Sequence, residues 1–314
     1  MSTFPARRPR RLRTTAQMRN LVAETEVRPS DLILPMFIVD GLDAPREIPS
    51  MPGVYQHTFD SLRRAAEEAL EAGVPCIDLF GVPLDEDKDD TGSVAWDPQG
   101  ILNRGISCLH EEFGDDLIVM ADTCLDEFTS HGHCGVLDDK GRVLNDESVK
   151  LYQDMARSQA RAGAQIVSPS GMMDGQVGAI RADLDEAGHE DVAIMAYSAK
   201  YASAFFGPFR DAVGSSLEGD RRTYQQDPRN FRESLLEAEL DIEEGADFVM
   251  VKPGLPYLDV LSAVAETSPV PVAVYQVSGE YAMVKAAAAN GWIDGESIML
   301  ESLTAFKRAG AGQI

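Results

Sequence analysis

From residue 31 onward, short apolar runs rich in β-branched residues alternate with amphipathic helical segments, and this alternation constrains the fold most strongly. It is typical of βα units stacked along a parallel sheet. Most of the runs are apolar on both faces, as expected of strands that helices cover. The predicted strands are Leu32–Val39, Cys76–Val82, Leu117–Leu125, Gln165–Pro169, Val192–Lys200, Phe248–Pro253 and Val270–Val277.

Helical segments lie between these strands. Phe59–Glu71 and Asp146–Arg161 are each followed within two residues by a glycine, the residue type that favours a helix C-cap. A further helix, Glu296–Arg308, should lead into an eighth strand. The sequence stops at Ile314, where that strand would begin, so we expect the eighth strand to be truncated.

We therefore predict an α/β fold, a (β/α)8 TIM barrel in which residues 31–314 form one catalytic domain. The length of 314 residues and the hydrophobic content of 44% suit one large domain. A doubly wound open sheet is the structural alternative. No glycine-rich dinucleotide turn follows the first predicted strand, which favours the barrel.

The charge of the chain excludes some functions. With 52 acidic and 28 basic residues, the net charge of −24 would repel a phosphate backbone, so we expect no nucleic-acid partner. No apolar stretch approaches about 18 residues, and the start lacks the apolar segment of a secretory signal, so we expect no membrane association and a cytoplasmic location. Acidic excess with arginine preferred over lysine would suit a halophilic protein. The four cysteines are too sparse for a disulfide framework.

Residues 1–30 are predicted to form an extended N-terminal arm. Six arginines crowd its first 19 residues, whereas the whole chain has only seven lysines. A basic run is most often a solvated tail. The alternative is an arm that reaches onto an acidic neighbouring subunit.

Polar residues end five of the predicted strands. In barrels of this type the reactive groups lie at the carboxyl ends of the strands. We therefore expect these polar side chains to converge on one site. They are Asp122, Cys124, Asp126, Ser168, Ser170, Asp174, Lys200, Lys252, Tyr275 and Ser278.

Two lysines stand out among them. Lys252 follows four apolar residues of a buried strand, and Lys200 occupies the corresponding place one strand earlier. Burial favours the neutral amine and a second cation nearby strengthens that effect, which makes an amine nucleophilic toward carbonyl carbons. The pair therefore predicts imine chemistry. A single lysine at such a place would more often extend to solvent or pair with a carboxylate.

One eleven-residue stretch contains Cys124, Asp126 and Cys134, together with His131 and His133. Two thiolates and a carboxylate could hold zinc and leave a position open for substrate. The alternative is a pair of core cysteines beside a polar loop. A structural zinc module would need paired Cys-x-x-Cys units, which the sequence lacks.

Residues 201–228 form a long connection without clear periodicity, as is typical of lids and binding loops. Arg210, Arg221 and Arg222 could clamp a substrate carboxylate in a bidentate fork, although exposed loop arginines are mostly solvated. Four aromatic residues of the loop could cover the site or pack on the barrel. They are Tyr201, Phe205, Phe206 and Phe209.

Five segments resemble the porphobilinogen synthase (5-aminolevulinate dehydratase) family, and the similarity extends from the arginine-rich start to the last residue. They are MAYSAKYASAFFGPFRDA, VMVKPGLPYLD, SPSGMMDGQVGAIR, TSHGHCG and YQVSGEYAM. The resemblance implies a TIM barrel with an arm for subunit contacts, assembled as a homo-octamer. It also implies a lyase of tetrapyrrole (heme, cobalamin, chlorophyll-type) biosynthesis that condenses two 5-aminolevulinate molecules to porphobilinogen with loss of two waters.

The resemblance also implies roles for individual residues. Lys252 would form an imine with the substrate that supplies the propionate side, and Lys200 with the one that supplies the acetate side. Asp122 would be the acid/base carboxylate beside them. Glu237 matches a glutamate that in some members contributes to an allosteric magnesium site at a subunit interface.

Four further residues are implied to bind the substrate carboxylates. Arg210, Arg221 and Gln225 would hold the acetate-side substrate. Ser278 would hold the propionate-side substrate.

The predicted zinc ligands depart from the family pattern. Zinc-dependent members carry three cysteines where this chain has Cys124, Asp126 and Cys134, so the ligand set is a hybrid. Two other functions remain open from the residues alone. One is a class I aldolase-like lyase, which also needs a strand-end imine lysine but would not explain the second lysine or the thiols. The other is a catalytically inactive barrel that serves as a binding or structural subunit.

Overall fold

The barrel wall consists of parallel strands that follow one another in chain order. The computed structural model describes residues 6–217 and 219–314. Each wall strand is hydrogen-bonded to the next, and each lies inside a range predicted from the sequence. They are β1 (Ile33–Val39), β4 (Cys76–Val82), β5 (Ile118–Thr123), β6 (Ile166–Pro169), β7 (Ala193–Lys200), β8 (Phe248–Lys252) and β9 (Val272–Val274).

Residues 312–314 occupy the gap between the last wall strand and the first. On one side, Val274 donates its N–H to the carbonyl of Gln313. On the other side, Ile33 donates its N–H to the carbonyl of Ile314. These bonds bridge β9 and β1 at the amino-terminal end of the wall, and the only pairing of Gln313 among the described strands is an isolated bridge to Ala273. The order of the wall strands has no reversal, so the fold is the predicted barrel and not a doubly wound sheet.

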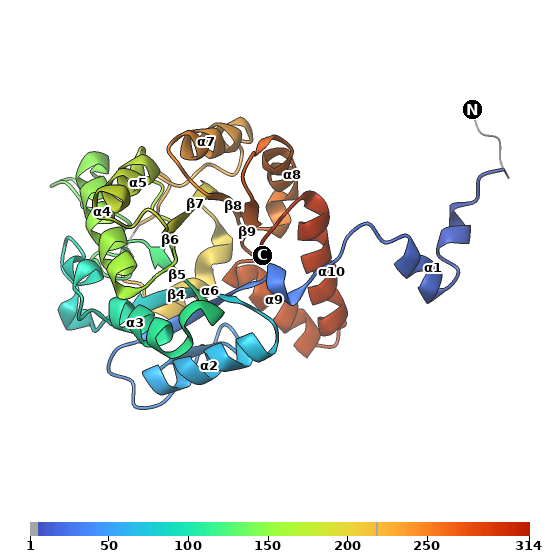
Figure 1. Cartoon of the computed structure of the whole chain (residues 1–314), viewed down its shortest axis with the longest axis horizontal. Helices are drawn as coiled ribbons and strands as arrows, with labels where there is room; N and C mark the ends of the chain where they lie inside the picture. The colour runs from blue at the N-terminus through green and yellow to red at the C-terminus, as the bar shows by residue number, and fades with distance from the viewer. Residues whose placement is uncertain (1–5, 218) are drawn as a thin grey trace.

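Helices cover the outside of the wall (Figure 1). Local sequence sets their ends: the Thr58 side chain accepts a hydrogen bond from the N–H of Ser61 at the start of α2, and Gly163 ends α4 with φ 107°. The helices are α1 (Ala16–Leu21), α2 (Phe59–Glu71), α3 (Ile101–Phe113), α4 (Asn145–Ala162), α5 (Gln176–Glu186), α6 (Gly207–Val213), α7 (Arg232–Glu243), α8 (Leu258–Thr267), α9 (Ser278–Ala289) and α10 (Gly295–Ala309).

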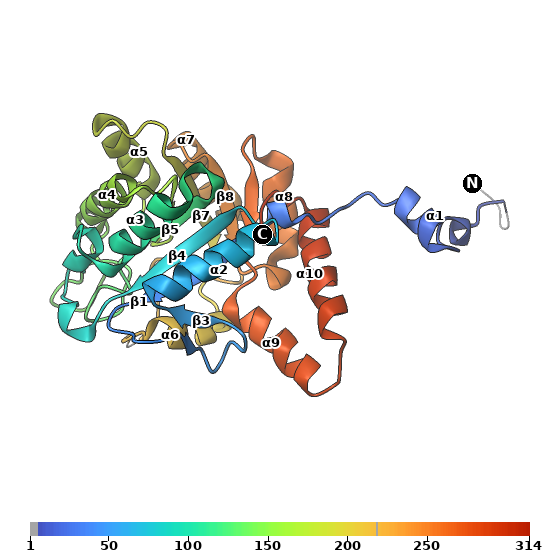
Figure 2. The ribbon, with the colours of Figure 1, turned by 60° about the horizontal axis from the view of Figure 1, so that its bottom comes forward.

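The N-terminal segment leaves the barrel. Residues 6–30, with α1, extend away from the body in both views (Figures 1 and 2). Leu12, Leu21 and Val22 are exposed on this segment. Residues 1–5 of the predicted arm lie outside the described residues. The shape is that of an arm, and its role in subunit contacts stays a prediction.

The elements not predicted from the sequence include two short strands and one short helix. β2 (Arg46–Glu47) and β3 (Tyr55–His57) extend the sheet beyond β1, with β3 parallel to β1 and β2 antiparallel to β3. Helix α6 lies in the long connection 201–228. Within the described part of the chain, no helix is long and apolar enough to cross a membrane.

Candidate active site

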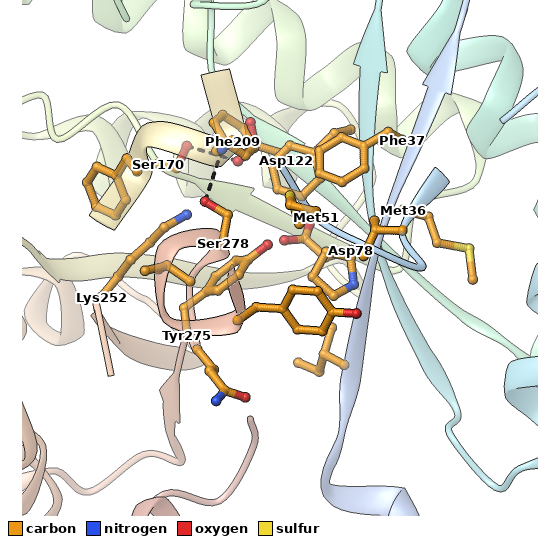
Figure 3. Close-up of a pocket in the computed structure, with 18 of the residues that line it drawn as sticks. Met36, Phe37, Met51, Asp78, Asp122, Ser170, Phe209, Lys252, Tyr275 and Ser278 are labelled. Carbon is orange, nitrogen blue, oxygen red and sulfur yellow. Dashed lines mark hydrogen bonds between the residues drawn. The ribbon is translucent and has the colours of Figure 1, made fainter. Parts of the chain in front are cut away.

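A cavity of about 880 Å³ contains the carboxyl ends of the wall strands. Its volume falls in the range of small-molecule sites, roughly 300–1,000 Å³. Figure 3 shows Lys252, Asp122, Ser170 and Ser278 around it. The cavity brings together most of the residues predicted from the sequence, namely Asp122, Asp126, Ser170, Lys200, Arg210, Arg221, Arg222, Gln225, Lys252, Tyr275 and Ser278.

The Lys252 amine lies in an aromatic cage at the end of β8. The side chain is 8% exposed, and its strand is apolar up to that point. Burial and the nearby Lys200 lower the pKa of Lys252 to about 8, so a neutral, nucleophilic amine is available near neutral pH. Nζ lies over four rings, with centroids at 4.0 Å (Tyr275), 4.8 Å (Tyr197), 5.6 Å (Phe206) and 5.7 Å (Phe209).

Lys200 ends the neighbouring strand and pairs in register with Lys252. Its Nζ donates to the carbonyl of Ser170 at 2.6 Å. The Ser170 hydroxyl in turn donates to Asp122 at 2.9 Å. Burial raises the pKa of Asp122 to about 6, against the opposing charge of Lys200. One serine therefore links the second lysine to a carboxyl group whose pKa suits acid–base work.

The ligand atoms of Cys124, Asp126 and Cys134 lie within 4.8 Å of one another, and all three residues are buried. The Tyr152 hydroxyl donates to the carbonyl of Cys134 at 2.7 Å and lies 3.5 Å from the Cys124 sulfur. Gly171 makes room for that ring, because a Cβ there would lie 1.9 Å from the tyrosine oxygen. The fold thus holds two thiols and a carboxylate at one point.

Burial, nearby charges and a hydrogen bond set the ionisation of these three side chains. Burial opposes a charge on Cys134, but the hydrogen bond from Cys124 and the charge of Arg221 outweigh it and lower the pKa of Cys134. Burial and the same hydrogen bond raise the pKa of Cys124. Arg221 lies 2.6 Å from Asp126 and keeps the pKa of Asp126 low despite burial. Zinc binding would displace the proton of Cys124, because the thiolate is the ligand, and two thiolates and a carboxylate would then fit a zinc ion with one position left open.

Comparison with known proteins decides the family. The model of the delta-aminolevulinic acid dehydratase family matches residues 6–314. The delta-aminolevulinic acid dehydratase of Mycobacterium tuberculosis is 63% identical over 311 residues, which cover 99% of this chain and 94% of that enzyme. The chain belongs to the delta-aminolevulinic acid dehydratase family. It is therefore a lyase of tetrapyrrole biosynthesis, which removes the aldolase-like alternative.

Further relatives agree. The dehydratase of Streptomyces coelicolor is 62% identical over 312 residues, with 99% of this chain and 94% of that enzyme covered. A crystal structure of the Toxoplasma gondii dehydratase (porphobilinogen synthase), in complex with the reaction product porphobilinogen, superposes with a TM-score of 0.95 at 47% identity. The match covers 98% of this chain and 88% of that one.

Four other residues predicted from the sequence differ in their surroundings and in whether they line the cavity. Gln225 is buried, and its Nε2 has no hydrogen-bond partner among the described residues. The Ser278 hydroxyl accepts from the N–H of Phe209 at 3.0 Å. Glu237 lies on α7 and does not line the cavity, and burial with the nearby Asp174 raises its pKa to about 7. Tyr201, expected as possible cover, is a buried core residue stacked on Tyr257 instead.

Sequence reasoning missed two acids of this site. Asp78 on β4 is 1% exposed and accepts a hydrogen bond from the Tyr197 hydroxyl at 3.0 Å. Burial and the charge of Asp122 raise the pKa of Asp78 to about 8. Glu127 is also buried, and neither carboxyl oxygen has a partner among the described residues. The signal for Asp78 was an acid inside the otherwise apolar run Cys76–Val82.

Proposed function

We propose that this dehydratase condenses two 5-aminolevulinate molecules to porphobilinogen through imines at Lys252 and Lys200. The observation that carries the proposal is the placement of two buried lysines, in register on neighbouring strands, in one cavity. Each amine attacks the ketone of one substrate and displaces water. A C–C bond and a C–N bond then join the substrates, the lysines are released, and the net loss is two waters.

Lys252 is assigned to the propionate-side substrate, with Ser278 at its carboxylate. The Lys252 amine is nucleophilic because burial and the charge of Lys200 disfavour its protonated form. Ser278 supports this assignment because it lines the same cavity and its hydroxyl holds Phe209, one of the cage rings.

Lys200 is assigned to the acetate-side substrate, with Arg210, Arg221 and Gln225 at its carboxylate. The unpartnered amide of Gln225 is a donor that a carboxylate oxygen would satisfy. Guanidinium groups suit the same ligand. Asp122 is assigned as the acid/base group, because its carboxyl accepts from Ser170 next to the Lys200 amine.

Zinc is the metal proposed for Cys124, Asp126 and Cys134. Thiolates favour zinc over magnesium, and the open fourth position suits water or the acetate-side substrate. When bound, the metal supplies a Lewis acid to the reaction. Asp126 is a harder ligand than the cysteine it replaces, and it is already paired with Arg221. Both features predict weaker binding than at a three-cysteine site.

The assembly is proposed to be a cytoplasmic homo-octamer in which residues 1–30 contact neighbouring subunits. The arm leaves its own barrel with exposed apolar side chains, which supports a partner surface. Glu237 is proposed to contribute to an allosteric magnesium site. Its neighbours Asp174, Glu233 and Glu244 give it an acidic setting away from the cavity.

A colour assay for the pyrrole product tests the proposed reaction. The purified chain should form porphobilinogen from 5-aminolevulinate, and Lys252→Met and Lys200→Met should each abolish it. Lys285→Met, an exposed lysine on α9, is the matched control and should keep wild-type turnover. An unmodified chain that binds 5-aminolevulinate but forms no pyrrole would favour the inactive binding subunit.

A further inference from the structure

Asp78 lies in the barrel interior beneath the lysines. It faces Pro35 on β1 and Met120 on β5 in the strand register. Asp122 lies two residues further along β5, so Asp78 is one layer deeper in the barrel than the carboxyl group assigned to acid–base work. Figure 3 shows both acids and Lys252 around the same cavity. Burying a carboxyl group at this depth costs folding free energy, so packing alone does not explain its presence.

The contacts of Asp78 connect it to Lys252. One carboxyl oxygen accepts from the Tyr197 hydroxyl, and the other is buried without a partner among the described residues. The Tyr197 ring is one wall of the lysine cage, 4.8 Å from Nζ. The titratable and charged groups that act on Asp78 come from its own strand and from the strands around it. They are Cys76, Asp122, Tyr197, Lys252 and Tyr275.

We propose that Asp78 is a positioning residue that balances the charge of Lys252 during imine formation. In the reactive protonation state of the free enzyme, the pair consists of a neutral amine and a protonated carboxyl. When the amine nitrogen bonds to the ketone carbon and the C–O bond breaks, the products are an iminium cation, the Asp78 carboxylate and one water. That water takes one hydrogen from the amine and one from the carboxyl, so no proton is exchanged with solvent.

The physical reason is the cost of an unpaired charge in an aromatic cage. Burial and Asp122 raise the pKa of Asp78 to about 8, and burial and Lys200 lower the pKa of Lys252 to about 8. Because the two values meet, a proton leaves one group as readily as the other. The iminium forms beside a carboxylate, and no isolated cation has to be buried.

Asp78→Asn tests this role through the pH profile of kcat/KM. In the wild type the profile rises as Lys252 loses its proton, and the fraction of Asp78 that is ionised near pH 8 raises the pKa of Lys252. Without the carboxylate, the rise should move to lower pH by about one pH unit. The maximum should fall at least about tenfold, because the iminium has lost its counter-charge. Asp247→Asn removes a carboxylate at the start of β8, at the opposite end of the barrel, and should leave the profile unchanged.

Tyr197→Phe gives a second measurement that does not alter the acid. It removes the hydrogen bond that favours the carboxylate, so the rise should move in the same direction by a smaller amount. A lower maximum with the rise at its wild-type pH in both variants would show a structural role only and overturn the proposal. If Asp78→Asn does not fold, an unmoved rise in Tyr197→Phe overturns it alone.

The inference rests on the proposed imine at Lys252, and the two can fail separately. Borohydride reduction of the wild type with 5-aminolevulinate, followed by mass spectrometry, reports the imine directly. Absence of label on Lys252 would refute the proposed function. Label on Lys252 in the wild type, with equal label and an equal pH profile in Asp78→Asn, would refute the inference alone.

Discussion

Replacing Lys252 by Met should abolish turnover and stabilise the fold at neutral pH. The pKa of Lys252 falls from 10.5 to about 8 in the folded state. At about 1.4 kcal/mol per pH unit, the folded chain therefore holds this ammonium about 3 kcal/mol less well than water does. Loss of the cation–π contact with Tyr275, 4.0 Å from Nζ, removes about 1 kcal/mol of that gain. The net stabilisation should be about 2 kcal/mol.

The pH dependence separates this origin from better packing. Below pH 8 both the folded and the unfolded chain carry the ammonium, so the whole free-energy cost of burying it, about 3 kcal/mol, is present. Between pH 8 and 10.5 the folded chain has lost the proton and the penalty shrinks, and above 10.5 it disappears. Urea unfolding at pH 7 and pH 10.5, at one protein concentration, measures both values. A variant less stable than the wild type at pH 7, or a gain equal at both pH values, would refute the reasoning.

Three further predictions concern salt, metal and effector. The melting temperature should rise as potassium chloride is added, because salt screens the self-repulsion of a chain with net charge −24. A melting temperature that stays constant or falls would remove the halophilic hypothesis. Chelation should abolish activity, and added zinc, but not magnesium, should restore it. The Asp126→Cys variant should retain zinc at a higher chelator concentration than the wild type. Full activity of a metal-free preparation would exclude zinc from the mechanism. Glu237→Gln should remove any stimulation by magnesium, and unchanged stimulation would exclude Glu237 from that site.

The barrel was predictable because its strands are short, apolar on both faces and separated by helices with clear ends. Phe59–Glu71 was predicted with the bounds of α2 because its helical pattern is followed by a glycine, and in the structure Thr58 caps its start. Helix α6 was not predictable, because its seven residues include a glycine and a proline and are too few to show a period. The pairing of β3 with β1 depends on contacts between separate segments, which periodicity does not report.

The site was predictable where its residues end strands. Lys200, Lys252 and Asp122 share the carboxyl rim because parallel strands in a barrel bring their ends together. Tyr201 was ambiguous, since an aromatic residue after a strand can point to the site or to the core. Asp78 was missed because its importance comes from what surrounds it in the barrel interior, namely Tyr197 and the Lys252 amine.

The most direct test of the imine mechanism is reductive trapping with peptide mapping. The chain is incubated with 5-aminolevulinate, reduced with borohydride, digested and analysed by mass spectrometry, with Lys252→Met and Lys285→Met treated in parallel. The account predicts a substrate adduct on the peptide that contains Lys252, retained in Lys285→Met and lost in Lys252→Met, with a second adduct at Lys200. Pyrrole formation by a chain that carries no adduct at either Lys252 or Lys200 would contradict it.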